Sequence, residues 1–392
     1  MRVIGSEPSI VESRRRDSSP ESTGERDGMI ACYPTYARQL PGTDRWRVKA
    51  TGMIARPLPE WSRRRSAALA ILRRVLEIAP EHDSDPVFRA RSGAFLFQRV
   101  VGCRVVLDVG GREVDAGVTD RLGHFETSFD LDSSDLEGLS SSLGWIGYQA
   151  RLDAVDGQEQ HLVELLQQAS GGPASPEPAG CRNPLSSTGQ VQFIPPAGLS
   201  VISDIDDTVK LSDVGDRREL LANTFLRPFQ PVPGMVDLYR QWHAEETAFH
   251  YVSASPWQLA GCLAGFFEES GLPTGSMHMS LFRFKDITPL GRIPSKKRSK
   301  RRAIEQILRD FPGRRFVLVG DSGEKDPEIY AAVARRFPQQ VAAIAIREVA
   351  GRHQKKSLEE RLSRLRQKLP GRLVQPFQRA EELDSFLASA AS

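Results

Sequence analysis

The feature that constrains this chain most is a short apolar run that ends in a group of acidic residues. Leu199 to Ile202 follow a Pro-Pro-Ala-Gly segment and have the composition of a buried strand. This strand leads directly into Ser203-Asp204-Ile205-Asp206-Asp207-Thr208. Carboxylates this close together repel one another unless a cation neutralises them, and Mg²⁺ prefers such hard oxygen ligands. The stretch therefore predicts a metal site, although an Asp-x-Asp-x-Thr sequence is also typical of a surface turn or a helix N-cap.

After Pro196 the sequence alternates short apolar runs with helical segments, which predicts a parallel sheet with crossover helices. The expected strands are 199–203, 249–252, 277–281, 316–319 and 341–346, and the expected helices are 235–244, 257–270, 300–311 and 327–337. In an open α/β sheet the functional residues gather outside the carboxyl ends of the strands. Polar residues follow three of these strands, namely Asp204, Ser253 and Asp321.

Each of these polar residues has an ordinary structural explanation when it is taken alone. Ser253 is suited to cap a helix, although Ser255 before a proline is the better cap. Asp326, which also precedes a proline, is a good helix start. Taken together, two acidic strand ends, a hydroxyl strand end and a lysine at a helix start form the set that phosphoryl transfer uses.

These residues resemble the four motifs of the haloacid dehalogenase superfamily of aspartyl phosphotransferases. The matching elements are Asp204-x-Asp206-x-Thr208, Ser253, a lysine that opens a helix, and Gly320-Asp321 with Asp326. More narrowly, Ser203 to Lys210, Pro233 to Met235, Tyr251 to Trp257 and Gly320 to Tyr330 are similar to the catalytic domain of the actin-patch-associated, Mg²⁺-dependent phosphatidate phosphatases. The resemblance covers residues 190–390 and implies hydrolysis of phosphatidate to diacylglycerol and phosphate.

The resemblance implies a role for each matching residue. Asp204 would attack phosphorus and form an aspartyl-phosphate, and Asp206 would act as general acid and base. Ser253 and a lysine would bind the transferring phosphoryl group. Lys300 matches the position of the family's lysine, and Lys297 is the alternative. The cofactor would be Mg²⁺, and its ligands would be Asp204, Asp206, Asp321 and Asp326.

The remaining residues of the acidic motif receive no catalytic role. Thr208 is expected to hold the loop through its hydroxyl, and Asp207 is interpreted as a solvated carboxylate. The segment 211–232 that follows corresponds to the place where this superfamily carries a cap over the site. An ordinary helix packed on the sheet is the alternative.

The cap segment contains three apolar residues that could form a wall beside the substrate, Phe225, Leu226 and Phe229. A cap as short as this would leave the site open to a large substrate, which favours a lipid head group or a macromolecule over a small sugar phosphate.

Residues 30–168 have mostly β character and predict an antiparallel, β-sandwich-like domain. The expected strands are 46–53, 103–109, 114–119, 124–129, 145–154 and 191–194, with 114–119 and 124–129 paired as a hairpin. An amphipathic helix at 61–79 interrupts them and either covers one edge of the sandwich or lies on an anionic membrane. The remaining boundaries are a disordered tail at 1–28, a linker or long loop at 169–190, and a phosphatase domain at 191–392.

Composition places few further limits on the chain. No apolar run approaches the roughly 18 residues needed to cross a bilayer, and residues 1–28 lack the apolar core of a signal peptide. The 4 cysteines have neither a disulfide nor a zinc-site spacing. We therefore expect a cytoplasmic protein. Basic clusters at 63–65, 296–302 and 352–368 suggest anionic partners, with peripheral membrane contact as one form and no nucleic acid expected.

Three functions remain compatible with the sequence. The first is an Mg²⁺-dependent phosphatidate phosphatase, and the second is the same chemistry on a soluble or protein phosphomonoester. The third is a non-catalytic, membrane-associated scaffold in which the β domain carries the function. The joint presence of Asp204, Asp206, Asp321 and Lys300 argues against the scaffold, which has no need of all four.

Overall fold

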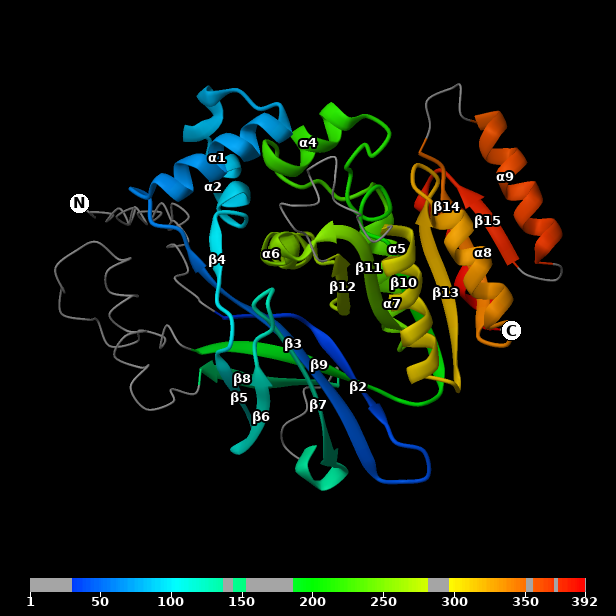
Figure 1. The fold of residues 1–392 in the computed structure, drawn as a ribbon. Helices are drawn as coiled ribbons and strands as arrows, with labels where there is room; N and C mark the ends of the chain where they lie inside the picture. Colours follow the sequence, from blue (N-terminus) through cyan, green and yellow to red (C-terminus); the bar gives the residue numbers. More distant parts are fainter. Residues whose placement is uncertain are drawn as a thin grey trace, which may run out of the picture.

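The computed structural model describes residues 30–136, 144–152, 186–280, 296–349, 355–369 and 373–391. These residues form two β-sheets with helices around the second one (Figure 1). The predicted tail and most of the predicted linker lie outside the described residues. Within the described part of the chain, no helix is both long enough and apolar enough to cross a membrane.

The N-terminal sheet is mixed, because β2 and β9 run parallel while the other pairs are antiparallel. Its longest strand, β3, pairs with four others, and the order along the rest of the sheet is β3-β2-β9-β8-β5-β6. Buried residues of β3, β5 and β8 share one hydrophobic core, so the sheet curls around it as a sandwich would. The strands are β1 (Ile30–Cys32), β2 (Thr35–Gln39), β3 (Arg45–Pro57), β4 (Phe97–Arg99), β5 (Arg104–Val109), β6 (Arg112–Val118), β7 (His124–Asp132), β8 (Trp145–Leu152) and β9 (Ser186–Ile194).

The predicted hairpin between 114–119 and 124–129 is wrong. Its turn does form, since the Asp120 carboxylate accepts the N–H groups of Leu122 and His124. The two strands nevertheless separate: β6 pairs with β5, and β7 pairs with β3 from Arg45 opposite Asp132 to Met53 opposite His124. Strand β3 is longer than β6, so β7 can pair along more residues with β3 than with β6.

Strand β9 begins inside the segment predicted as a linker. It pairs with β8 and β2, so it belongs to the N-terminal sheet and the next domain starts after Pro195 and Pro196 rather than at 191. The Ser- and Gly-containing sequence conceals this strand, and Gly189 is required there because a Cβ would lie 2.1 Å from Cζ of Tyr148.

The predicted helix 61–79 corresponds to α1 (Arg63–Leu76), which begins at Ser62, whose side chain accepts the N–H of Arg65. A short helix, α2 (Pro86–Gly93), follows with Asp85 as its cap. Leu72 and Leu76 of α1 pack in the same hydrophobic cluster as Phe225 of the cap segment. The apolar stripe of α1 is therefore buried in a core that residues of both domains share.

The second sheet is fully parallel and confirms the predicted α/β fold. Its order is β12-β11-β10-β13-β14-β15, so the third, second and first strands of the domain precede the fourth, fifth and sixth. The strands are β10 (Gly198–Ser203), β11 (Ala248–Pro256), β12 (Ser276–Ser280), β13 (Arg314–Asp321), β14 (Val341–Arg347) and β15 (Leu373–Phe377).

Alternating residues of these strands bury opposite faces of the sheet. Val201, Val317 and Val319 belong to one cluster, which includes residues of α5, α6 and α10. Ile202 and Leu318 belong to the other, which includes residues of α7, α8 and α9. The helices are α4 (Arg217–Phe225), α5 (Met235–Ala244), α6 (Ala260–Ser270), α7 (Lys296–Asp310), α8 (Asp326–Arg336), α9 (Lys355–Lys368) and α10 (Phe386–Ala391).

The two domains are joined by buried aromatic residues near the start of the N-terminal sheet. The rings of Tyr33 and Trp257 stack with centroids 4.0 Å apart. Tyr36 of β2 donates a hydrogen bond to Asp310 at the end of α7 at 2.7 Å and packs edge-on against His250 of β11. The N-terminal sheet is therefore attached directly to the helix that carries Lys300.

Candidate active site

The candidate site lies where the order of the parallel sheet reverses, between β10 and β13. Asp204 follows β10 and donates its backbone N–H to the carbonyl of Val319 in β13. Asp321 ends β13. The crossover connections leave β10 and β13 on opposite sides, and in such sheets ligands bind outside the carboxyl ends of the strands at this point.

Lys300 joins the two acidic motifs. Its Nζ lies 2.6 Å from Oδ1 of Asp204 and 2.6 Å from Oδ1 of Asp326, and all three side chains are buried. Burial opposes the ammonium charge, but the attraction of the two carboxylates outweighs it and raises the pKa of Lys300 above its usual value. The structure thus places Lys300, rather than an exposed lysine, in contact with the predicted nucleophile. The side chain of Lys297 lies outside the described residues.

Gly320 makes the approach of Asp326 possible. A Cβ at this position would lie 2.3 Å from Oδ2 of Asp326 and 2.8 Å from the ring of Tyr330. The Tyr330 hydroxyl itself donates to the Val319 carbonyl at 2.9 Å. Glycine at position 320 therefore has a steric reason, since any larger residue there would push Asp326 out of the site.

Three carboxylates converge at this point of the sheet. The ligand oxygens of Asp204, Asp321 and Asp326 all lie within 4.8 Å of one another and all three residues are buried. Burial, opposed by Lys300 and reinforced by the other carboxylates, raises the pKa of Asp204 well above its usual value. Burial and then the neighbouring Asp326 raise the pKa of Asp321 to about 7. One ammonium is too little positive charge for three carboxylates in so small a volume.

In the described part of the chain, one carboxylate oxygen of Asp321 is held by hydrogen bonds and the other is not. Its Oδ1 accepts the backbone N–H groups of Gly323 at 2.6 Å and Glu324 at 3.0 Å, which fixes the orientation of the carboxylate. Its Oδ2 is buried and has no hydrogen-bond partner among the described residues. A buried, unpartnered carboxylate oxygen beside two more carboxylates fits a divalent metal ion with oxygen ligands.

Asp206 faces a different set of partners. Its Oδ1 pairs with Lys210 Nζ at 2.8 Å and accepts the Ser212 hydroxyl at 2.7 Å. Its Oδ2 accepts the hydroxyls of Ser255 at 2.6 Å and Ser253 at 3.3 Å. Burial opposes ionisation, but Lys210 and these hydrogen bonds hold the pKa of Asp206 well below its usual range. The carboxylate is not part of the cluster of three, so a metal contact of Asp206 would fall to its main-chain carbonyl.

Sequence reasoning missed Ser255, Lys210 and Ser212, which hold Asp206. Ser255 was predicted to cap a helix, but β11 continues to Pro256, so Ser253 and Ser255 lie on the same face of the strand and both donate to Asp206. The spacing of two residues on an extended strand was the signal that could have identified Ser255.

Asp207 is buried, and its interpretation as a solvated carboxylate is wrong. It adopts a left-handed backbone with φ of 53°, a conformation that Asp tolerates better than most residues. Its carboxylate accepts the backbone N–H groups of Ser212, Asp213 and Val214 at 2.8, 2.8 and 2.6 Å. Asp207 therefore fixes the first turn of the cap segment.

Thr208 is also buried, and its hydroxyl lies 3.5 Å from Oδ2 of Asp204. The hydroxyl thus contacts the predicted nucleophile itself as well as the loop that carries it.

The segment 211–232 carries one helix, α4, which the N-terminal domain holds in place. The rings of Phe95 and Phe225 lie 5.6 Å apart, and Arg91 of α2 donates to the Thr224 carbonyl at 2.7 Å. The Arg91 guanidinium also lies 3.3 Å from the centroid of the Phe229 ring. Phe225, Leu226 and Phe229 therefore pack into a hydrophobic cluster instead of forming an open apolar wall.

A parallel sheet with this strand order, an Asp-x-Asp motif at the point of reversal, and a lysine shared with a second acidic motif form the arrangement that the resemblance to the haloacid dehalogenase superfamily implies. Residues 199–348 match the family model described as "Phosphatidate phosphatase APP1, catalytic domain". The resemblance drawn from the motifs is thereby confirmed for this domain, and the family is one of phosphomonoester hydrolases.

Two curated relatives match part of the chain. The chain is 36% identical to "Phosphatidate phosphatase APP1" of Saccharomyces cerevisiae over 172 residues, which is 43% of this chain and 29% of that protein. It is 37% identical to an uncharacterized protein of Schizosaccharomyces pombe, C29B5.04c, over 155 residues, or 39% of this chain and 25% of that protein. The matches thus span less than a third of either relative.

Among solved structures, a putative beta-phosphoglucomutase from Thermotoga maritima aligns with 49% of this chain and 99% of its own, with a TM-score of 0.29 and 12% sequence identity.

Proposed function

We propose that this protein is an Mg²⁺-dependent phosphatidate phosphatase that works through an aspartyl-phosphate. The observation that carries the proposal is the contact of Lys300 with Asp204 and Asp326 beside the unpartnered oxygen of Asp321, inside a domain that matches the phosphatidate phosphatase family. The named relative from yeast supports phosphatidate as the substrate.

The residues divide the hydrolysis into two displacements. In the first, a carboxylate oxygen of Asp204 forms a bond to phosphorus and the ester bond to diacylglycerol breaks. The leaving oxygen takes its proton from Asp206, which is ionised beside Lys210 in the structure and therefore has to bind a proton from solvent before this step. In the second, Asp206 takes a proton from water, the water oxygen attacks phosphorus, and the bond to Asp204 breaks to release phosphate. Asp206 returns to its protonated state, so the cycle balances.

Positive charge and hydroxyl donors stabilise the phosphoryl group during both steps. Lys300 lies beside the attacking carboxylate, and Ser253 lies at the next strand end. Asp204, Asp321 and the Asp206 carbonyl would hold the metal ion, with Asp326 in support. When bound, Mg²⁺ supplies the charge that lets an anionic carboxylate approach an anionic phosphate. We extend the proposal to a cytoplasmic protein that meets its substrate at an anionic membrane surface, which the exposed basic side chains of α1 support.

The test is phosphate release from phosphatidate in detergent micelles, compared with a panel of soluble phosphomonoesters and a phosphopeptide. We expect Mg²⁺-dependent release from the lipid that a chelator abolishes. Asp204→Asn should lower kcat by at least about a thousandfold, since the nucleophile is lost. Asp237→Asn is the matched control, because Asp237 is an exposed acid on α5 whose substitution leaves the site intact.

The alternatives are separated by the same measurements. Faster turnover of a soluble or protein phosphomonoester than of the lipid would assign the same mechanism to another substrate. Near wild-type activity in Asp204→Asn would rule out the covalent mechanism. A folded protein that releases phosphate from none of these substrates, with or without Mg²⁺, would favour the scaffold.

A further inference from the structure

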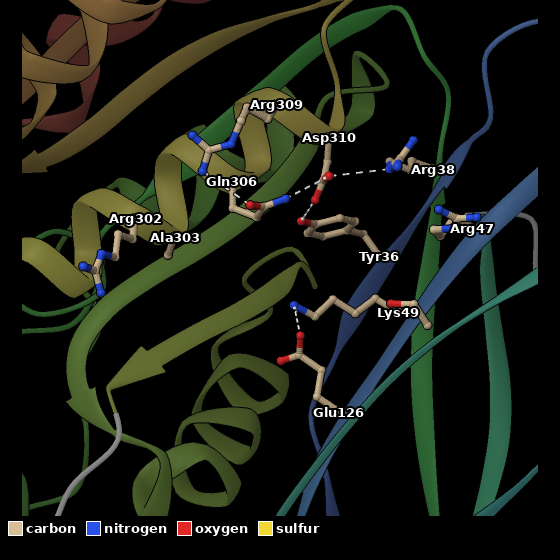
Figure 2. A pocket seen from close by; sticks show the side chains of 11 residues that line it. Tyr36, Arg38, Arg47, Lys49, Glu126, Arg302, Ala303, Gln306, Arg309 and Asp310 are labelled. Atoms are coloured by element: carbon tan, nitrogen blue, oxygen red, sulfur yellow. Dashed lines mark hydrogen bonds and ion pairs between the residues drawn. The ribbon is translucent and has the colours of Figure 1, made fainter. Parts of the chain in front are cut away.

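A cavity of about 720 Å³ lies between the N-terminal sheet and α7, away from the carboxylate cluster. Figure 2 shows side chains of α7 facing those of β2 and β3 across it. We call this cavity the seam pocket. Its lining residues are Tyr36, Arg38, Arg47, Lys49, Glu126, Ser128, Arg302, Ala303, Gln306, Arg309 and Asp310. The volume lies within the range of pockets that hold small ligands, about 300–1,000 Å³.

The secondary structure explains why charged side chains meet here. On β3, Val48 and Ala50 face the core of the N-terminal domain, so Arg47 and Lys49 must face the other way. On α7, Ile304, Ile307 and Leu308 pack on the parallel sheet. Helical spacing then places Arg302, Gln306, Arg309 and Asp310 on the side toward the N-terminal sheet.

The lining carries excess positive charge. Five cationic side chains face two carboxylates, those of Glu126 and Asp310. Lys49 pairs with Glu126 at 2.9 Å, and Arg38 lies 3.5 Å from Asp310. These two pairs leave three cationic residues without a carboxylate partner inside the pocket.

Two of the remaining three cations are available to a ligand. Arg47 is held by Asp130 in a two-point contact at 2.8 and 3.0 Å. Arg309 has only long contacts, at 3.5 Å to Glu305 and 3.4 Å to Gln306. Arg302 is exposed, and no ion pair or hydrogen bond of its side chain occurs among the described residues.

We propose that the seam pocket binds a ligand bearing two or more phosphate groups, held chiefly by Arg302 and Arg309, with the Lys49–Glu126 pair on the facing wall. A guanidinium group can donate two parallel hydrogen bonds to two oxygens of one phosphate group. A small cavity lined by several cations raises the local concentration of phosphate-bearing anions. The ligand is either a free polyphosphorylated molecule or the polyphosphorylated headgroup of a lipid. This site is separate from the phosphatase centre and does not depend on the proposed reaction.

The seam pocket is lined by the same helix, α7, that carries Lys300. Lys300 at the start of this helix contacts Asp204, and Asp310 at its end receives the hydrogen bond of Tyr36. At a rise of ~1.5 Å per residue the two positions are about 15 Å apart along one helix. A ligand that bridges β3 and α7 would therefore hold the helix that positions Lys300.

The test is isothermal titration of the full chain with inositol hexakisphosphate in the absence of Mg²⁺. We expect one site, and at least a tenfold weaker Kd, about 1.4 kcal/mol, in the double variant Arg302→Glu with Arg309→Glu. Arg335→Glu is the matched control, since Arg335 is an exposed arginine on α8 outside the pocket, and it should change Kd by less than about twofold. Arg302→Gln, which removes no side-chain hydrogen bond or ion pair within the described part of the chain, is used if the double variant does not fold.

Vesicles distinguish the two sources of the ligand. Binding to phosphatidylcholine vesicles that contain phosphatidylinositol bisphosphate, with competition by inositol hexakisphosphate, would identify a lipid headgroup. Binding of the soluble probe alone would identify a free ligand. No binding of either probe, or equal weakening by the Arg335 and Arg302 variants, would overturn the proposal. Turnover of a soluble phosphomonoester by the same variants reports separately on the phosphatase centre and should be unchanged.

Discussion

Lys300 Nζ lies 2.6 Å from a carboxylate oxygen of Asp204 and equally close to one of Asp326. Lys300→Met would leave both carboxylates buried without this cation, so we expect a loss of about 3–5 kcal/mol in the free energy of unfolding, together with loss of phosphate release. Urea denaturation in the presence of a chelator measures the first effect. Mg²⁺ should restore part of the stability.

Lys325→Met is the control for that experiment, because Lys325 is exposed. If Lys297→Met abolished turnover while Lys300→Met retained it, the choice of Lys300 as the phosphate-binding lysine would be wrong.

The second prediction concerns Asp207, whose carboxylate accepts three backbone N–H groups of the cap segment. Asp207→Asn keeps the size and tolerates the left-handed backbone but loses the charge and one acceptor oxygen. We expect a loss of about 1–3 kcal/mol in stability and faster amide hydrogen exchange over 211–216. Asp237→Asn should change neither, and unaltered exchange in the Asp207 variant would contradict the role assigned to this carboxylate.

The third prediction uses the buried His250. Burial, then His278 and Arg314, holds the pKa of His250 well below its ordinary value. Burial, then Lys49, lowers the pKa of His278 to about 3. At a pH below the ordinary pKa of histidine but above these lowered pKa values, the unfolded chain binds protons that the folded protein does not. Stability is therefore complete above pH 6.5 and falls as the pH drops below it, by about 1.4 kcal/mol per pH unit for each histidine.

Substitution of single histidines shows which of them causes the pH dependence of the free energy of unfolding. His250→Gln should remove about one proton from the pH dependence of the free energy of unfolding between pH 6.5 and 4.5. His82→Gln should leave the dependence as it is in the wild type. An unchanged slope in the His250 variant would show that other groups govern the acid sensitivity.

The fourth prediction concerns Arg91, the link between α2 and the cap segment. Arg91→Ala removes the hydrogen bond to Thr224 and the contact with the Phe229 ring, so we expect a loss of about 1–3 kcal/mol and faster proteolysis near α4. Arg89→Ala on the same helix removes only an exposed ion pair with Glu60 and should have little effect. Equal proteolysis of the two variants would count against the link.

Much of the second domain could be predicted because its signals are local. Apolar runs alternate with helical segments, and a polar residue directly after a strand must lie at one edge of a parallel sheet. That argument alone brought Asp204, Ser253 and Asp321 to one end of the fold.

The features that escaped prediction depend on contacts between distant parts of the chain. Whether β7 pairs with β6 or with β3 depends on the length of the ladder that each partner offers. The charge of Asp207 does not show that three N–H groups surround it. The seam pocket combines residues more than 250 positions apart, such as Lys49 and Arg302.

The attachment of α4 to α1 and α2 has a kinetic consequence. A substrate that reaches Asp204 by displacing α4 has to move two helices from the other half of the chain as well, because the three pack in one cluster. A movement of this kind would be a concerted rearrangement on the microsecond to millisecond scale, slower than the swing of an isolated loop. A partner that binds the N-terminal half of the molecule would therefore change how often a substrate reaches Asp204.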